Sequence, residues 1–171
     1  MMKSLYAKTR TDHNLGLLLI DEQFLPQAMA MLDSAKKEIA ISTFKLEITD
    51  KPRGRNLRAF FMKLVEKCKS GVQVNILFNC HDNRHATPRT NLPASAFLKK
   101  AGADVRYLKD NRCCHAKTLI VDREMALIGS HNLSVMSCVS NFEVSYLTPD
   151  VEIVNRLSDV FAHSFNAAKK A

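Results

Sequence analysis

The sequence predicts an α/β protein, a three-layer α/β/α sandwich built on a mixed β-sheet. Short β-rich runs alternate along the chain with stretches of helical periodicity, a pattern typical of a sheet covered by helices. Late in the chain only three residues separate two β-rich runs, which indicates a hairpin and an antiparallel part of the sheet. The chain has 171 residues, 46% of them hydrophobic, which is enough for one core. We therefore expect a single domain over residues 1–171, with residues 1–14 as a candidate N-terminal arm.

The first predicted helix covers residues 25–37 and leads into a strand at residues 38–44. Pro26 suits the first turn of a helix. Lys36 and Lys37 suit its last turn, where the helix dipole favours positive charge.

The second predicted helix covers residues 55–70. Its apolar residues recur with the period of a helix that buries one face, and Gly71 marks its end. They are Leu57, Phe60, Phe61, Leu64, Val65 and Cys68. This period places Phe60 and Phe61 in the core rather than on a base-stacking surface. The opposite face is basic and carries Arg55, Lys63, Lys67 and Lys69.

The remaining elements are short apolar runs or helical patterns bounded by Gly, Pro or polar residues. They are a strand at 72–78, a helix at 92–101 ended by Gly102, a strand at 105–108, the hairpin strands at 118–121 and 125–128, and a strand at 142–147. Pro149 opens the last helix, with Asp150 and Glu152 in its first turn. The polar stretch 79–91 is the longest predicted loop.

The composition is that of an ordinary globular protein. No apolar run near the start of the chain approaches the roughly 20 residues of a membrane span, and no secretory signal is visible. Five cysteines are an odd number in a chain large enough to need no disulfide, so we expect free thiols and a cytoplasmic location. The Cys113-Cys114 pair fits either a redox switch or two small side chains that fill apolar space beside the strand, and we favour the second interpretation.

Positive charge is concentrated in the middle of the chain. The net charge is +8, but residues 51–117 hold fifteen lysines and arginines against four acidic residues, a net +11. A basic band of this kind is typical of polyanion binders, although a solvated lysine-rich surface has the same composition.

One segment combines four chemically useful side chains at defined spacing. His115 and Lys117 are two residues apart at the start of a predicted strand, so they project from the same side. Ser130 and Asn132 follow the second strand of the hairpin, which would bring them alongside. An imidazole, an ammonium, a hydroxyl and a carboxamide at one spot suit a phosphodiester, because they supply a nucleophile and donors to the phosphate oxygens.

This segment resembles the signature of the phospholipase D superfamily. It reads H-x-K, four residues, D, six residues, G-S-x-N, from His115 through Asp122 to Asn132, and every fixed position is filled. Asn141-x-Glu143 is similar to the accessory pair of that superfamily. The order of elements resembles its small single-motif nucleases, so the resemblance implies a phospholipase D/nuclease-like fold.

The resemblance implies a covalent mechanism without metal or other cofactor. His115 would attack phosphorus, and a second histidine would protonate the leaving oxygen and then activate water. Lys117, Ser130 and Asn132 would hold the non-bridging oxygens. Glu143 would accept a hydrogen bond from His115. Asp122 would be a structural partner more than a direct participant.

Members of the superfamily usually need two such motifs, and this chain has one. No other histidine is followed by lysine two positions on. We therefore expect a homodimer that shares one active site, with His115, Lys117 and Asn132 of both copies meeting across a two-fold axis. His131, the variable position of G-S-x-N, is expected to face away from the site.

The basic band favours a nuclease. We expect nucleic acid as the partner, DNA rather than RNA, bound by Arg84 and Arg89 of the polar loop and by Lys63 and Lys67 of the second helix. The segment from His81 to His85 lacks the Glu and the helical period of a zinc-protease pair, so we predict no metal site.

Two alternatives stay open. A phospholipid phosphodiesterase would use the same chemistry, but the sequence shows no apolar entry surface, so we expect no stable membrane association. The second is a non-catalytic nucleic-acid-binding module with vestigial catalytic residues, against which the intact motif argues.

Overall fold

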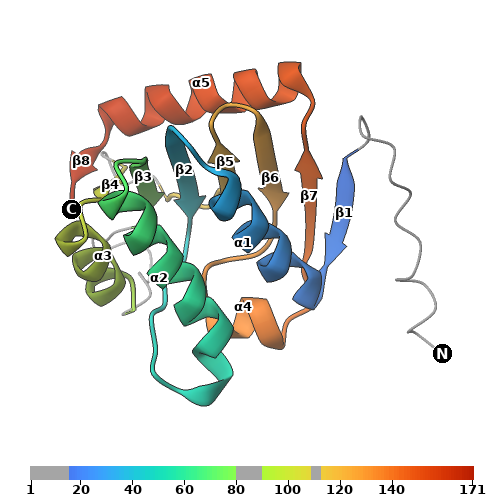
Figure 1. The fold of residues 1–171 in the computed structure, drawn as a ribbon, viewed down its shortest axis with the longest axis vertical. Coiled ribbons are helices and arrows are strands. Elements are labelled where there is room, and N and C mark those ends of the chain that lie inside the picture. The colour runs from blue at the N-terminus through green and yellow to red at the C-terminus, as the bar shows by residue number, and fades with distance from the viewer. Residues whose placement is uncertain (1–15, 80–89, 109–112) are drawn as a thin grey trace.

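The fold is built on an eight-stranded mixed sheet with the strand order β1-β7-β6-β5-β2-β3-β4-β8 (Figure 1). The computed structural model describes residues 16–79, 90–108 and 113–171. The β2, β3 and β4 strands are parallel to one another, and the other pairings are antiparallel. The strands are β1 (Leu17–Ile20), β2 (Glu38–Thr43), β3 (Gln73–Phe78), β4 (Asp104–Tyr107), β5 (Thr118–Val121), β6 (Met125–Gly129), β7 (Val144–Thr148) and β8 (Lys169–Lys170).

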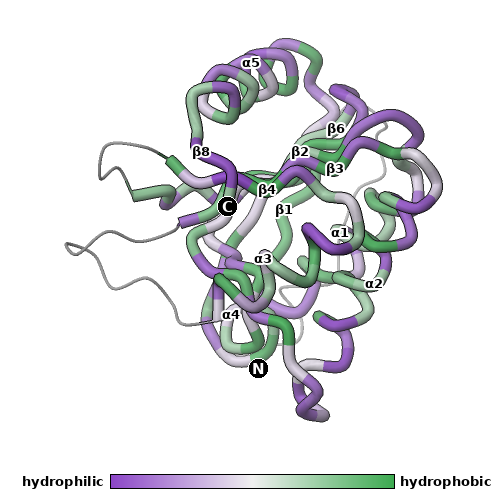
Figure 2. Tube along the Cα trace, turned by 90° about the vertical axis from the view of Figure 1, so that its left-hand side faces the viewer, coloured by the Kyte–Doolittle hydropathy of each residue, from purple (hydrophilic) through white to green (hydrophobic). Residues whose placement is uncertain are grey.

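Helices cover both faces of this sheet, which confirms the predicted three-layer sandwich. On one face lie α1 (Phe24–Ser34), α2 (Arg55–Lys69) and α3 (Asn91–Lys100), and on the other lies α5 (Val151–Ala167) (Figure 1, Figure 2). The buried apolar residues accordingly form a large cluster under the first three helices and a smaller one under α5. The short α4 (Val135–Val139) and the 3-10 turns η1 (Asp21–Gln23) and η2 (Pro52–Gly54) complete the described elements.

The predicted helix ends are mostly confirmed. Gly71 and Gly102 follow α2 and α3 with φ of +88° and +104°, a backbone region that favours glycine. Asp150 caps α5, because its carboxylate accepts a hydrogen bond from the N–H of Ile153 at 2.9 Å.

The end of α1 was predicted wrongly. The helix stops at Ser34, and Ala35 has already left helical geometry with ψ of 129°. Lys36 and Lys37 therefore do not form its last turn. Their backbone N–H groups instead donate to the carboxylate of Asp122, which is far away in the sequence.

Three short elements carry no sequence pattern strong enough to predict them. The edge strands β1 and β8 have four and two residues, and α4 has five. Such lengths are too short for a helical or strand period to be recognised. The α4 helix nevertheless matters for the site, because it lies between Asn132 and Glu143 in the chain.

Asp122 fastens the β5–β6 turn to the start of β2. Its carboxylate accepts hydrogen bonds from the N–H groups of Lys36, Lys37 and Glu38 at 2.7, 2.8 and 2.8 Å. Burial raises the pKa of this carboxyl, but the three backbone donors outweigh burial and hold the pKa below its usual value. Asp122 itself adopts a φ of +54°, which aspartate and asparagine tolerate. Asp122 thus has a structural role at the end of β5, whereas His115 precedes the start of that strand.

We predict that Asp122→Asn lowers the free energy of unfolding by about 2 kcal/mol, because an amide cannot accept from all three donors as the carboxylate does. A lowered pKa in the folded state means that this stabilisation is present above the usual aspartate pKa and is lost as the pH falls through the folded value. Urea unfolding of the variant should therefore show less loss of stability on acidification than wild type.

The matched control is Asp159→Asn, which removes an exposed carboxylate paired with Arg123 and should change stability by well under about 1 kcal/mol. Equal effects of the two substitutions would contradict the anchoring role of Asp122.

Candidate active site

The strand pairings bring the signature residues to one edge of the sheet. The β5 strand is antiparallel to β2, so its first residue, Thr118, pairs with Ser42 near the end of β2. Residues next to this point continue the pairing, since the N–H of Gly129 donates to the carbonyl of Lys117 at 3.1 Å and that of Ser130 to Val144 at 3.0 Å. The predicted hairpin is confirmed.

Gly129 is required by close approach of the neighbouring strand. A Cβ at this position would lie 2.0 Å from Oγ and 2.5 Å from Cα of Ser145. Any larger residue would push β6 away from β7 and displace Ser130. The close approach of Ser145 thus explains why the first position of the G-S-x-N element must be glycine in this chain.

His115 and Lys117 lie in direct contact. The Nζ of Lys117 is 3.1 Å from Nδ1 of His115 and donates to the His115 carbonyl at 2.6 Å. An ammonium can only donate, so Nδ1 is the acceptor and a neutral imidazole carries its proton on Nε2. Burial lowers the pKa of Lys117.

Phe44 is a site residue that sequence reasoning missed. Its ring lies 5.3 Å from the imidazole of His115, and the Nζ of Lys117 lies 5.8 Å from its centroid. An aromatic face near a cation favours the charged form. The signal available in the sequence was its position directly after β2, the strand that pairs with β5.

Asn132 is held by the chain on both sides. Its side-chain oxygen accepts from the N–H of Lys45 at 3.1 Å, and its own N–H donates to Oγ of Ser137 at 2.8 Å. The side-chain oxygen is thus occupied by Lys45, and the carboxamide N–H groups have no partner within the described residues. That orientation leaves two donors for a phosphate oxygen.

Glu143 has different partners from those expected. Its carboxylate accepts hydrogen bonds from Ser130, from Ser137 at 2.6 Å and from Asn141 at 3.0 Å, and no described hydrogen bond joins it to His115. Burial raises the pKa of Glu143, but these three donors outweigh it and lower the pKa. The expected His115–Glu143 hydrogen bond is thus not formed in this structure, in which Ser130, Ser137 and Asn141 are the side-chain donors to the carboxylate.

Ser130 also differs from its expected role. Its hydroxyl donates to Glu143 and accepts from the N–H of Val144 at 3.0 Å. A hydroxyl has one proton to donate, so Ser130 cannot donate to a phosphate oxygen without releasing Glu143. Ser130 is therefore engaged in holding the loop that carries Asn132, and its role toward the phosphate oxygens stays a prediction.

His131 points away from His115 and Lys117, as expected. Its ring stacks on Phe24 of α1 with centroids 4.3 Å apart and planes 6° apart. Its nitrogens lie 2.7 Å from Oγ of Ser145 and 3.0 Å from the carbonyl oxygen of Asp21. Burial lowers its pKa, which keeps it neutral.

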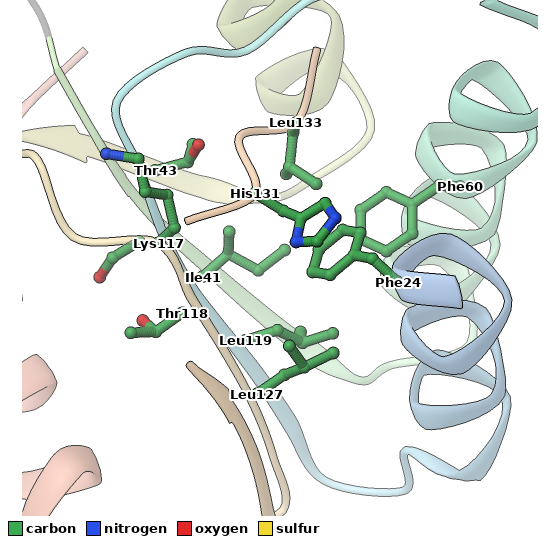
Figure 3. Close-up of a pocket in the computed structure, with 11 residues that line it drawn as sticks. Phe24, Ile41, Thr43, Phe60, Lys117, Thr118, Leu119, Leu127, His131 and Leu133 are labelled. Atoms are coloured by element: carbon green, nitrogen blue, oxygen red, sulfur yellow. The ribbon is translucent and has the colours of Figure 1, made fainter. Parts of the chain in front are cut away.

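His131 and Lys117 are among the residues that line a cavity of about 20 Å³, which has room for about one water molecule, and the ring of His131 is directed toward Phe24 and Phe60 (Figure 3).

Two buried asparagines hold the loops around His115. Asn91 accepts from the N–H of Leu46 at 2.8 Å and donates to the carbonyls of Phe44 and Asn79 at 2.9 and 2.7 Å. The side-chain oxygen of Asn79 in turn accepts from the N–H of Cys114 at 3.2 Å. Sequence reasoning assigned both asparagines to the ends of a polar loop and missed this function.

Lys63 and Lys67, which were predicted to bind nucleic acid, contact groups of this chain in the structure. Lys63 pairs with Asp33 at 3.0 Å and with Glu66 at 2.9 Å, and Lys67 donates to the carbonyls of Asp33 and Ala35 at 2.8 and 2.9 Å. Both lysines thus hold the end of α1, which leads into the start of β2, whereas His115 lies beside Phe44 after the end of β2. Their assignment to the nucleic-acid interface stays a prediction, and helical periodicity alone could not show which neighbouring groups each lysine contacts.

Several predictions fall outside the described residues, namely those for Arg84, Arg89, His81 and His85. Within the described ranges, no group of three or more His, Cys, Asp and Glu residues could hold a metal ion.

The four cysteines at the described positions are free thiols, and burial raises the pKa of Cys114 to about 11. A buried thiol with a raised pKa supports the interpretation that Cys114 fills apolar space in the core. Among the described helices, none is long and apolar enough to cross a membrane.

Comparisons with known proteins identify the family. The model of the family described as "Cardiolipin synthase, PLD-like domain" matches residues 28–165. The chain is 33% identical to the major cardiolipin synthase ClsA of Bacillus subtilis over 149 residues, which are 87% of this chain and 29% of that protein. It is 31% identical to a cardiolipin synthase of Staphylococcus aureus over 140 residues, 82% of this chain and 26% of that protein. The chain thus spans less than a third of these relatives.

Solved structures agree on the fold. Nuc of Salmonella typhimurium, a phospholipase D family member, superposes with a TM-score of 0.74 at 19% identity, over 92% of this chain and 99% of Nuc. NucT of Helicobacter pylori gives a TM-score of 0.72 at 16% identity over the same shares. The chain therefore belongs to the phospholipase D superfamily of phosphodiester-processing enzymes.

We predict that Lys117→Arg extends activity to higher pH. Because the pKa of Lys117 is lowered, its positive charge is lost at a lower pH than that of an ordinary lysine, and phosphate binding is lost with it. Arginine stays charged throughout this range. The alkaline limb of kcat/KM, measured on a soluble phosphodiester, should move upward in the variant even if the maximal rate falls.

The control for this shift is Lys100→Arg, an exposed position at the end of α3. A limb that stays in place in Lys117→Arg, or that moves equally in both variants, would show that Lys117 does not set it.

Proposed function

We propose that this chain is a phosphodiesterase that works through a phosphohistidine intermediate on His115. The observation that supports it most directly is the contact of His115 with the Lys117 ammonium at 3.1 Å, at the sheet edge to which the G-S-x-N loop also returns. Lys117 supplies a charge and the free amide of Asn132 supplies donors where negative charge builds up on phosphorus. No step requires a metal ion.

The chemistry proceeds in two displacements. An imidazole nitrogen of His115 bonds to phosphorus, and the bond from phosphorus to the leaving oxygen breaks as that oxygen takes a proton from a second imidazole. Water then attacks phosphorus and gives its proton to the second imidazole, and the phosphorus–nitrogen bond breaks. His115 is thereby regenerated.

The second imidazole comes from a second copy of the chain. His131 is buried against Phe24 and held by two hydrogen bonds, so it is not available at the site. A two-fold dimer would place one His115 from each copy on either side of the phosphorus. One would act as nucleophile and the other as general acid and base.

A phospholipid is the substrate class that the sequence relatives favour. The matches at 31–33% identity over most of this chain are cardiolipin synthases. The nuclease interpretation loses part of its support, because Lys63 and Lys67 are engaged inside the chain and lie away from His115.

Nucleic acid remains the second candidate substrate. It is favoured by the net charge of +8. Steep weakening of binding by salt would support it, since each displaced counterion contributes about −0.9 to the slope of log K against log salt on duplex DNA.

We predict that His115→Ala abolishes hydrolysis of phosphatidylcholine, plasmid DNA and RNA alike, and that wild-type activity survives EDTA. Product formation on the three substrates, with and without chelator, identifies the substrate class. His163→Ala is the matched control, because His163 is exposed on α5, and it should retain activity. Loss of wild-type activity in EDTA that Mg²⁺ or Mn²⁺ restores would refute the mechanism.

We predict that mixed dimers are inactive. When wild type and His115→Ala exchange subunits, each mixed dimer lacks either the nucleophile or the proton donor, so activity should follow the square of the wild-type fraction. Activity is measured after exchange has been verified by mass spectrometry. Linear dependence on the wild-type fraction, or activity in a species that sediments as a monomer, would contradict the shared site.

A further inference from the structure

The backbone of Asn132 is held by two side chains of the short helix α4. The hydroxyl of Ser137 accepts a hydrogen bond from the N–H of Asn132 at 2.8 Å. The thiol of Cys138, the next residue, donates to the carbonyl oxygen of Asn132 at 3.7 Å, which is a weak hydrogen bond. Both backbone polar groups of Asn132 are therefore bound by α4, and the stronger of the two bonds is the one to Ser137.

Ser137 is itself fixed on all sides. It is 2% exposed, and its backbone N–H donates at 3.4 Å to the hydroxyl of Ser134, the residue that caps α4. Its hydroxyl donates to the carboxylate of Glu143 at 2.6 Å. A hydroxyl has one proton, so this bond to Glu143 turns the oxygen lone pairs of Ser137 toward the N–H of Asn132.

A chain of hydrogen bonds thus runs from Glu143 through Ser137 to Asn132. Three side chains donate to Glu143, and among the described residues Ser137 is the one of them that also binds Asn132. A hydrogen bond to an ionised carboxylate is short and strong, and bonds in a chain polarise one another. The charge of Glu143 therefore strengthens the hold of Ser137 on Asn132, although Glu143 does not bind His115.

The carboxamide of Asn132 depends on this hold. One hydrogen bond fixes the carboxamide directly, from the N–H of Lys45 to its oxygen at 3.1 Å. The torsion that turns a carboxamide has broad, shallow preferences, so its direction follows from its partners and from the backbone that carries it. A shift of the Asn132 backbone would move its two N–H donors away from the phosphate oxygens, and a misplacement of about 1 Å costs an enzyme about a hundredfold in rate.

We propose that Ser137 is a positioning residue of this site: it links the carboxylate of Glu143 to the backbone of Asn132 and so fixes the direction of the amide donors. The inference rests on the proposed phosphodiesterase function and deepens it. Ser137 does not touch the substrate. Because the donors of Asn132 act most strongly when negative charge has built up on the phosphate oxygens, loss of Ser137 should slow the chemical step more than it weakens substrate binding.

The first test measures release of p-nitrophenol from p-nitrophenyl hexyl phosphate, a soluble phosphodiester. Ser137→Ala should lower kcat by about tenfold or more and change KM by less than about twofold. Ser158→Ala is the matched control, because Ser158 is also a buried helical serine, and its hydroxyl donates to the carbonyl of Val154 inside α5 at 2.7 Å. It should keep the wild-type kcat. Rates are corrected for the folded fraction of each variant, measured by urea unfolding.

A double-mutant cycle separates positioning from a merely structural role. If Ser137 acts through Asn132, Ser137→Ala should lower kcat by about tenfold in the wild-type background and by less than about twofold in Asn132→Ala. An equal fall in both backgrounds would overturn the proposal. Ser137→Cys is the second variant should Ser137→Ala fail to fold, because a thiol has a similar shape but donates and accepts weakly. It should show the same dependence on Asn132 with a smaller fall in kcat.

Nuclear magnetic resonance tests the same link without any turnover. The order parameter of the Asn132 carboxamide nitrogen should be high in wild type and in Ser158→Ala and should fall in Ser137→Ala, because the backbone that carries the carboxamide is released. An unchanged order parameter in Ser137→Ala would contradict the positioning role. Failure of the proposed function has a different signature, since wild type would then hydrolyse the diester no faster than His115→Ala. A lowered order parameter in Ser137→Ala would in that case still support the link from Ser137 to Asn132.

Discussion

The turn between β5 and β6 is fastened to the start of β2 by the carboxylate of Asp122, which accepts three backbone N–H groups. From this turn β5 runs antiparallel to β2, so a register fixed at one edge of the sheet determines which residues meet at the other. His115 and Lys117 precede β5 and therefore come to lie beside Phe44, directly after β2. Asp122, at one end of β5, thus helps to position His115 and Lys117 at the other end. This explains why all three residues belong to the same short signature.

The reactive edge is held rigid by buried polar groups that satisfy one another. Glu143 accepts from Ser130, Ser137 and Asn141, and the same Ser137 accepts from the N–H of Asn132. On the other side, Asn91 and Asn79 tie the segments around Phe44 and Cys114 together. A fully satisfied network in a weakly solvated place is costly to distort. Donors fixed in advance need little reorganisation when charge develops on the substrate, and this is how such sites stabilise a transition state.

The sequence predicted the positions of site residues that are close together in the chain. It did not predict hydrogen-bond partners that come from distant parts of the chain. His115, Lys117 and Asn132 sit at fixed spacing around a hairpin, so their convergence could be predicted. The partners of Glu143 could not, because a carboxylate is satisfied by whichever donors the folded loops present. Asn79 and Asn91 bind mainly backbone atoms, which leave no pattern in the sequence. For Lys63 and Lys67 the helical period gave the correct exposed face, but not the neighbouring end of α1 that occupies them.

The central claim is that His115 forms a covalent bond to phosphorus, and trapping that bond tests it most directly. The purified protein is mixed with p-nitrophenyl hexyl phosphate, quenched in alkali within the first turnover, and analysed by intact-protein and peptide mass spectrometry. The account predicts a phosphoryl hexyl ester on the peptide that contains His115, which is lost in acid and absent from His115→Ala. Steady turnover with no adduct at any quench time, or an adduct on another residue, would contradict it.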